Sequence, residues 1–118
     1  MTRVVYKICA RADWTQAVGS GVYAGSAVDQ ADGFIHFSTG RQAPETAAKH
    51  FAGQDDLVLV QVDAGRLPDG ALKWEPSRGG DLFPHLYAPL PVSAALRVDP
   101  LPWRDGEGHQ FPDQADDA

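Results

Sequence analysis

Apolar and polar residues are arranged along the chain in runs that predict several short strands. The stretch 3–9 (RVVYKIC) is β-branched and aromatic, with Lys7 on the side opposite its apolar neighbours. The stretch 56–63 (DLVLVQVD) is the most continuous apolar run, which predicts a central strand. Four further runs have strand composition, and they are FIHFS at 34–38, ALKWE at 71–75, FPHLYAPL at 83–90 and AALRVDPL at 94–101. Pro84 and Pro89 favour an edge strand or an interrupted strand for the third of these.

Two segments in the first half of the chain have the spacing of short helices. The first contains apolar residues from Trp14 onward and should stop at Gly19. The second lies in the stretch TGRQAPETAAKHFAG. Because Pro44 is tolerated only in the first turn, we expect this helix to begin at Gln42 or just before Glu45.

Together these elements predict an α+β fold, with about six short strands and two helices in the N-terminal half. The stretch 19–33 contains four glycines and is expected to form a long irregular connection. A chain of 118 residues has the size of one domain, which we place at residues 1–103. Residues 104–118 carry five acidic side chains and one arginine, so we expect an acidic, disordered tail. Such a tail either contacts a partner or is simply solvated, and we favour the solvated alternative.

The charge and hydropathy of the chain exclude several classes of function. The net charge is −6, and the ten Lys and Arg residues form no basic cluster of the kind that DNA or long RNA requires. No apolar run approaches the roughly 20 residues of a membrane helix. The N-terminus lacks the apolar segment of a signal peptide, so we expect a cytoplasmic protein. The single cysteine, Cys9, is interpreted as a small buried hydrophobic residue rather than a nucleophile.

Candidate chemistry begins with a histidine in the middle of a predicted strand. His36 alternates with two apolar neighbours, so it should point to the opposite strand face, together with Ser38. This polar pair lies just before a helix start, where unpaired backbone amides can hold an anion. The alternative is a hydrogen-bonded histidine on a half-buried sheet, followed by a helix cap.

A second group of polar and aromatic residues lies near the end of the predicted sheet. His85 follows a glycine-rich loop with Arg78, and Trp74 and Glu75 precede that loop. A cation, an acceptor and an aromatic surface are what a pocket for a charged, ring-bearing ligand needs. For Trp74 we favour a place in the core over a stacking role, and the alternative for Arg78 with Glu75 is a surface ion pair.

Other types of site have little support in the sequence. His50 lies on the flank of its predicted helix and His109 in the tail, so we assign neither to a site. The histidines have none of the recognised metal-ligand spacings, and we expect no metal site. The chain has no Walker-type loop, no GxGxxG motif and no nucleophile elbow.

Several of the quoted motifs resemble those of a bacterial family called domain of unknown function 952. They are VYKIC, DGFIHFST and WEPSRGGDLFPHLYAPL, and the resemblance runs from about residue 4 to residue 101. The resemblance implies a fold similar to that of ADP-ribosyltransferases, a split antiparallel β structure that binds NAD in a cleft. Active members of that fold use three residues from three strands, with a glutamate commonly the third.

Carried over to this chain, the resemblance places the three catalytic positions at Lys7, His36 and His85. A histidine in the third position supplies no negative charge to stabilise a departing nicotinamide, so the usual glutamate-dependent transfer is not expected. The expected ligand is NAD or another nucleotide or ADP-ribose-like molecule. The expected ligand-binding residues are Ser38, Thr39, Gln42, Trp74, Glu75, Arg78 and Tyr87.

Two alternatives to an enzyme with this cleft remain open. The first is a module that binds a small molecule or a protein without catalysis. The second is a histidine-dependent phosphoesterase, suggested by His36, Phe37 and Ser38. Such enzymes use two triplets of this kind, and the triplet at His85 lacks the aliphatic hydroxyl, so this alternative ranks last.

Overall fold

The structure is a computed structural model that describes residues 3–112, apart from the side chain of Arg78. The described helices are α1 (Arg11–Ser20), α2 (Ala27–Asp32) and α3 (Ala43–His50), with short 3-10 turns η1 (Ala64–Arg66), η2 (Arg78–Gly80) and η3 (Val92–Ala94). The longer strands are β1 (Val4–Ala10), β4 (Leu57–Asp63), β5 (Leu72–Pro76), β6 (Leu82–Leu86) and β8 (Ala95–Leu101). The two-residue strands are β2 (Val22–Tyr23), β3 (Ile35–His36), β7 (Leu90–Pro91), β9 (Trp103–Arg104) and β10 (Gly108–His109). The predicted α+β class, with antiparallel strands, is confirmed.

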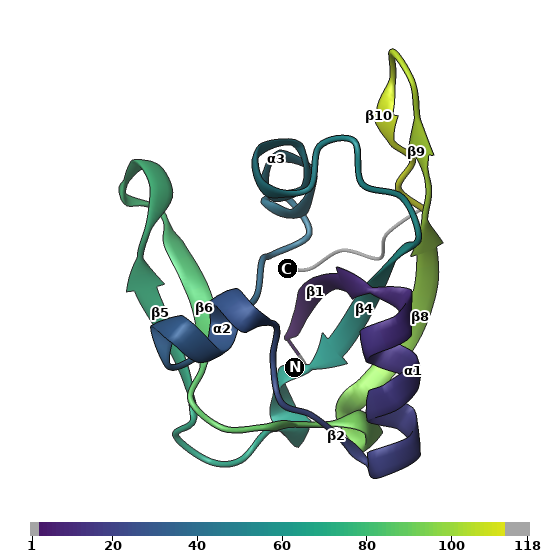
Figure 1. The fold of residues 1–118 in the computed structure, drawn as a ribbon. Coiled ribbons are helices and arrows are strands. Elements are labelled where there is room, and N and C mark those ends of the chain that lie inside the picture. Colours follow the sequence, from purple (N-terminus) through teal and green to yellow (C-terminus); the bar gives the residue numbers. More distant parts are fainter. Residues whose placement is uncertain (1–2, 113–118) are drawn as a thin grey trace.

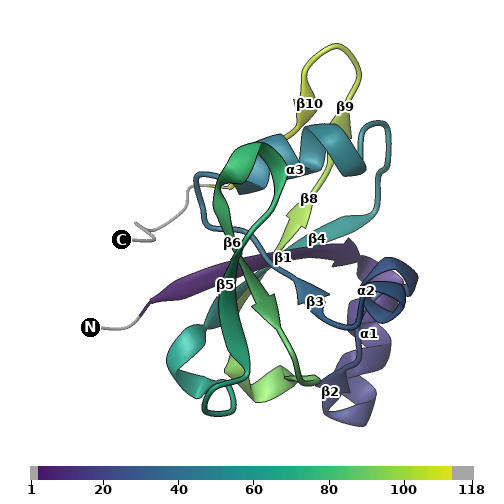
Figure 2. The same ribbon diagram turned by 90° about the vertical axis from the view of Figure 1, so that its left-hand side faces the viewer.

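The first sheet has the order β1-β4-β8, and β4 is its central strand as predicted. Its two faces are buried in different clusters: Val58 and Val60 of β4 belong to one, and Leu57 and Leu59 to the other. Burial on both faces explains why this stretch is a continuous apolar run rather than an alternating one. Helix α3 covers one face of this sheet, above β1 and β4 in Figure 2.

The second sheet has the order β3-β6-β5 and meets the first at one point. The peptide N–H of Tyr6 donates to the carbonyl of Ser38 at 2.7 Å, and the N–H of Ser38 donates back to Tyr6 at 2.9 Å. Beyond this bridge the two sheets separate, with β5 and β6 on one side of the molecule and β8 on the other (Figure 1). The resulting gap positions the candidate site described below.

The stretch 19–33 is more regular than its glycines suggest. It contains β2 and the six-residue helix α2, so the prediction of one irregular connection is wrong. Helix α2 has a capping box: the Ser26 side chain accepts from the Asp29 N–H, and the Asp29 carboxylate accepts from the Ser26 N–H. Gly25 and Gly33, at φ 103° and φ 86°, flank the helix and allow the sharp entry and exit.

Strand β6 is the middle strand of its sheet, so the prediction of an edge strand at Pro84 is wrong. The Pro84 carbonyl accepts from the Phe37 N–H at 2.9 Å, so the backbone of Pro84 faces the β3 side. Pro84 is opposite Trp74 in β5, and the missing N–H therefore removes no bond from the β5–β6 ladder. The predicted interruption is present around Pro89, between β6 and β7.

The C-terminal segment has regular structure where the composition indicated a disordered tail. Strands β9 and β10 form a hairpin, and the imidazole of His109 hydrogen-bonds the carbonyl of Gln54 at 2.9 Å. Phe111 packs, partly buried, against the cluster under α3. These packing contacts order residues 104–112, and residues 113–118 of the predicted tail lie outside the described residues. Within the described part of the chain, the helices are too short and too polar to cross a membrane.

Candidate functional site

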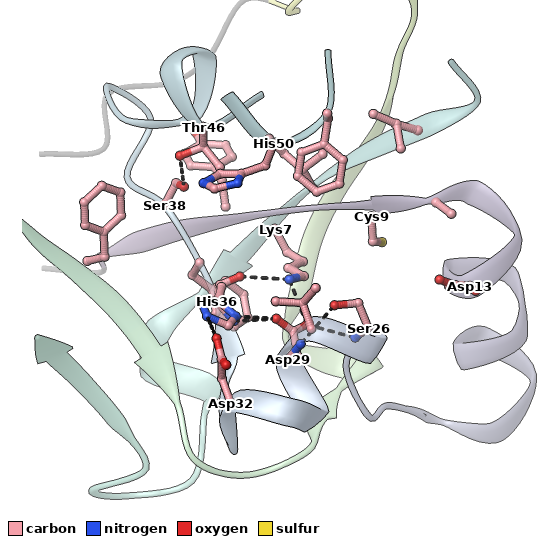
Figure 3. A pocket seen from close by; sticks show the side chains of 18 of the residues that line it. Lys7, Cys9, Asp13, Ser26, Asp29, Asp32, His36, Ser38, Thr46 and His50 are labelled. Atoms are coloured by element: carbon pink, nitrogen blue, oxygen red, sulfur yellow. Dashed lines mark hydrogen bonds and ion pairs between the residues drawn. The ribbon is translucent and has the colours of Figure 1, made fainter. Parts of the chain in front are cut away.

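A cavity of about 600 Å³ lies where the two sheets separate, which is within the size range of small-molecule sites. Strand β1 forms its floor, and α2, α3 and the β3–β6 pair form its walls. Figure 3 shows Lys7, Asp29 and His36 on one wall and Thr46 and His50 on the opposite wall.

The geometry of the gap follows from the single bridge between Tyr6 and Ser38. The next hydrogen-bonded pair of an extended ladder would be Ile8 and His36, but the side chains of Asp29 and Lys7 intervene. The Asp29 carboxylate accepts from the His36 N–H at 3.1 Å, and the Lys7 ammonium donates to the His36 carbonyl at 3.0 Å. The Ile8 peptide groups face the same edge as those of Tyr6, two residues earlier. No described strand pairs with Ile8 there, so one N–H and one C=O face the cavity.

Asp29 is the buried centre of the site, with only 2% of the residue exposed. It accepts from the Lys7 ammonium at 2.9 Å and contacts His36 Nδ1 at 2.6 Å, in addition to the bonds described above. Burial opposes its ionisation, but the hydrogen bond from His36 and the charge of Lys7 outweigh it and hold the pKa of Asp29 well below its usual range. A carboxylate with this many donors stays ionised near neutral pH.

His36 lies between two carboxylates that both come from α2. Its Nδ1 faces Asp29, and its Nε2 lies 2.9 Å from Asp32. A carboxylate only accepts, so the ring satisfies both contacts only as an imidazolium that donates from each nitrogen. In this arrangement His36 has no free ring nitrogen with which to bind or activate a ligand directly.

His85 has the opposite character, because its Nε2 has no hydrogen-bond partner among the described residues. Its Nδ1 lies 2.8 Å from Glu75, whose carboxylate also accepts from the Tyr87 hydroxyl at 2.7 Å. These bonds, first from Tyr87 and then from His85, lower the pKa of Glu75, and the same contact raises the pKa of Tyr87. An ionised Glu75 fixes the proton on Nδ1, so Nε2 of a neutral His85 carries the lone pair.

The two histidines are neighbours across the β3–β6 pair, where they are directly opposite each other. Their ring centroids are 5.6 Å apart. Phe34 packs against both rings, at 4.6 Å from His36 and 4.1 Å from His85, and stacks on Tyr87 at 5.2 Å. This aromatic contact restricts both imidazoles to one orientation.

The structure brings together four of the residues predicted for the site. Lys7, His36, Ser38 and His85 all line the cavity. Ser38 is itself hydrogen-bonded to Thr46 of α3, at 3.0 Å. The sequence suggested this grouping only through the resemblance to a known fold, since the two histidines lie far apart along the chain.

The five other predicted ligand-binding residues with described side chains lie outside the cavity lining. Glu75 and Tyr87 contact the cavity only indirectly, because Glu75 binds His85 and Tyr87 binds Glu75. Thr39 and Gln42 stabilise the turn before α3 through reciprocal hydrogen bonds of 3.0 and 3.1 Å. Trp74 faces the main core, where the Arg3 guanidinium lies 4.0 Å above its ring. The packing favours the core alternative for Trp74, and the side chain of Arg78 is outside the described residues.

Several cavity residues were missed by the sequence analysis. Asp29 and Asp32 were missed because α2 was not predicted, although the SAVD stretch at 26–29 has the spacing of a capping box. His50 was set aside, yet it lines the cavity from the end of α3. Cys9 also lines it, but burial raises the pKa of this thiol to about 11, so it is not a thiolate nucleophile.

The charges around the cavity are mostly negative. Asp13, Asp29 and Asp32 line it, and Lys7 is the one Lys or Arg among the described lining residues. Because Lys7 is already paired with Asp29, the described lining residues offer no unpaired Lys or Arg to a phosphate group.

Comparison with known proteins assigns the chain to a family. Residues 8–98 match the family described as Protein of unknown function (DUF952). The chain belongs to this family. The match includes His36 and His85 and begins one residue after Lys7. No curated protein matches the sequence.

Two solved structures of one protein from Caulobacter crescentus are similar to this chain. A crystal structure of protein CC0527 from Caulobacter crescentus is 53% identical, covers 91% of this chain and 93% of its own, and has a TM-score of 0.86. A solution NMR structure of CC0527 is 55% identical, covers 90% of both chains and has a TM-score of 0.77. These relatives support the observed fold and name no ligand or activity.

Proposed function

We propose that the cavity binds NAD or a related nucleotide through its ribosyl end, with His85 as the group that exchanges a proton with the ligand. The observation that carries the proposal is the pairing of His36 and His85 on the wall of a cavity of about 600 Å³. The ligand class comes from the ADP-ribosyltransferase-like fold that the sequence motifs imply, which stays a prediction.

The sugar and ring groups of such a ligand have hydrogen-bonding partners in the cavity. The open Nε2 of His85 can accept a proton from a hydroxyl group, because Glu75 holds the other nitrogen as a donor. The free N–H and C=O of Ile8 can bind a carboxamide or the edge of a base, which presents one acceptor and one donor. The negative lining favours sugar and ring groups inside, with the phosphates toward solvent.

Binding without catalysis is the second candidate, and one observation favours it. His36 and Lys7 are both held by Asp29, so neither is free to act on a ligand unless that network opens. In this alternative His85 orients the ligand through one hydrogen bond and no bond is broken.

An NMR titration tests the binding proposal. The ring signals of His36 and His85 are followed as NAD, ADP-ribose and AMP are added, and both are expected to shift with at least one of them. His85→Ala should weaken binding about tenfold, because a ligand group loses its buried partner. His109→Ala is the matched control, since His109 lies in the β9–β10 hairpin, outside the cavity lining, and it should leave the affinity unchanged.

The outcomes distinguish the candidates. Release of nicotinamide from NAD by the native chain, abolished in His85→Ala, would support catalysis. Binding with no turnover would support the second candidate. If neither histidine responds to any of the three ligands, the nucleotide proposal is wrong.

A further inference from the structure

Strand β8 forms an open edge of the first sheet, away from the cavity. It pairs with β4 on one side, and no described strand pairs with its other side. Figure 1 shows it on the side of this sheet away from β5 and β6. A strand edge of this length usually has charged residues, a proline or a bulge that prevents pairing with another chain, or it is covered by another segment.

The backbone of β8 leaves a short self-complementary row of hydrogen-bonding groups. The peptide groups of Tyr6 bond to Ser38, so they face away from β4, and the Gln61 peptide groups opposite them face β8. Gln61 is paired with Arg97, and the hydrogen-bonded pairs recur at every second residue. The peptide groups of Arg97, Asp99 and Leu101 therefore face β4. Those of Val98 therefore face outward, and Pro100 offers only its carbonyl there. Val98 is thus the one central residue that can exchange both bonds with a copy of itself.

The side chains of β8 have the same symmetry. If two antiparallel copies are centred on Val98, Arg97 of each copy lies directly opposite Asp99 of the other. Within one chain these residues form an ion pair at 2.6 Å, and both stand on one face of the strand. A guanidinium has five donors and can bind its own Asp99 and that of the second copy.

The opposite face of the same edge is apolar and exposed. Leu96 is 44% exposed and Val98 is 41% exposed. In the centred register Val98 faces its own copy and Leu96 faces Pro100, which would remove these side chains from water. The edge therefore has charge complementarity on one face and apolar contacts on the other.

We infer that β8 is the interface of a two-fold dimer, in which two copies of the chain pair antiparallel through Val98 to form one six-stranded sheet. A β-bulge at Leu96 of β8, opposite Gln61 and Val62 of β4, limits the pairing at one end, and Pro100 limits it at the other, which leaves a short central segment. The other sheet edge, β1, is bonded to Ser38, so the assembly closes as a dimer and does not extend.

Sedimentation equilibrium of the full chain tests the dimer. An interface made by one short strand lies at the small end of the size range, so we expect a concentration-dependent dimer between about 10 μM and 1 mM. The expected mass at the upper limit is twice the 12.7 kDa of one chain. A mass of one chain throughout this range would overturn the inference.

A charge-exchange experiment identifies the surface. Arg97→Asp makes both positions acidic, and Asp99→Arg makes both basic, so each variant alone places like charges opposite each other. Each variant alone should be a monomer, and an equimolar mixture should form dimers, because every opposed pair then has opposite charges. Mixing cannot restore the ion pair within a chain, so rescue would report contact between copies.

The control is Arg11→Asp, which removes the Arg11–Asp56 ion pair, also exposed, at the end of the other edge strand. This variant should dimerise like the native chain. If Arg97→Asp alone dimerises as well as the native chain, or if mixing the two variants restores nothing, the β8 interface is wrong. Circular dichroism of each variant confirms that it is folded.

Discussion

At the scale of single residues, one buried carboxylate organises the site. Asp29 binds the Lys7 ammonium, the ring and the backbone of His36, and the backbone of Ser26. Lys7 and Asp29 are almost fully buried, so each charge depends on the other for compensation.

Replacing this carboxylate should be strongly destabilising. In Asp29→Asn the buried Lys7 ammonium loses its counter-charge, and we expect a loss of about 3–5 kcal/mol in the free energy of unfolding. The control is Asp32→Asn, whose side chain is 50% exposed and contacts the same histidine, and which should cost less than about 1 kcal/mol. Urea denaturation followed by circular dichroism measures both. Equal losses in the two variants would contradict the central role of Asp29.

At the scale of secondary-structure elements, α2 is held in place by its ends. Gly25 at φ 103° brings the chain close to Asp29, and the capping box fixes the first turn. A helix of six residues has little stability of its own, so these end contacts and the bonds of Asp29 to Lys7 and His36 decide whether it forms.

A pair of glycine substitutions separates backbone strain from this close approach. In Gly25→Ala the new Cβ would lie 2.8 Å from the Asp29 Cβ, and it would displace the carboxylate from its partners. Gly21→Ala has a similar φ of 94° but no atom within 4 Å, so it reports the strain of the backbone alone, about 1–2 kcal/mol. We expect Gly25→Ala to lose at least about 1 kcal/mol more in thermal or urea unfolding. If the two variants are equally stable, the close approach of residue 25 to Asp29 does not contribute to the free energy of unfolding.

At the scale of the whole molecule, two small sheets meet at one bridge and enclose the cavity beside it. The charges that hold the gap open are part of the fold, so the stability of the molecule is linked to their ionisation. Asp29 is the described group in this network with a resolved and strongly lowered pKa.

The sign of the resulting pH dependence follows from that lowered pKa. The unfolded chain takes up a proton at Asp29 near pH 4, whereas the folded chain does so only at lower pH. Its contribution to stability is therefore complete above about pH 5 and is lost as the pH falls toward the pKa of the folded state. The free energy of unfolding, measured in urea at about pH 7, 5 and 3, should fall more steeply below pH 5 in the native chain than in Asp29→Asn. Parallel curves would contradict this linkage.

Local patterns in the sequence were sufficient for some of the regular elements of the fold. The apolar run 56–63 predicted the central strand β4, and Pro44 predicted the start of α3, because burial on both faces and the restricted φ of proline act within a few residues. The same local reasoning failed for α2 and for the middle strand β6. For α2 the outcome depends on Lys7 and His36, which bind its Asp29 from β1 and β3. For β6 it depends on Phe37, whose N–H donates to the Pro84 carbonyl.

The sequence by itself therefore determined the class of the fold, the central strand and the presence of histidines on polar strand faces. Only the tertiary structure decided which polar groups meet. The pairing of His36 with His85 requires the register of β3 on β6, and the separation of the sheets requires the Lys7–Asp29 pair to stand between Ile8 and His36. Strand register and buried ion pairs join residues distant along the chain, and short-range periodicity carries no information about either.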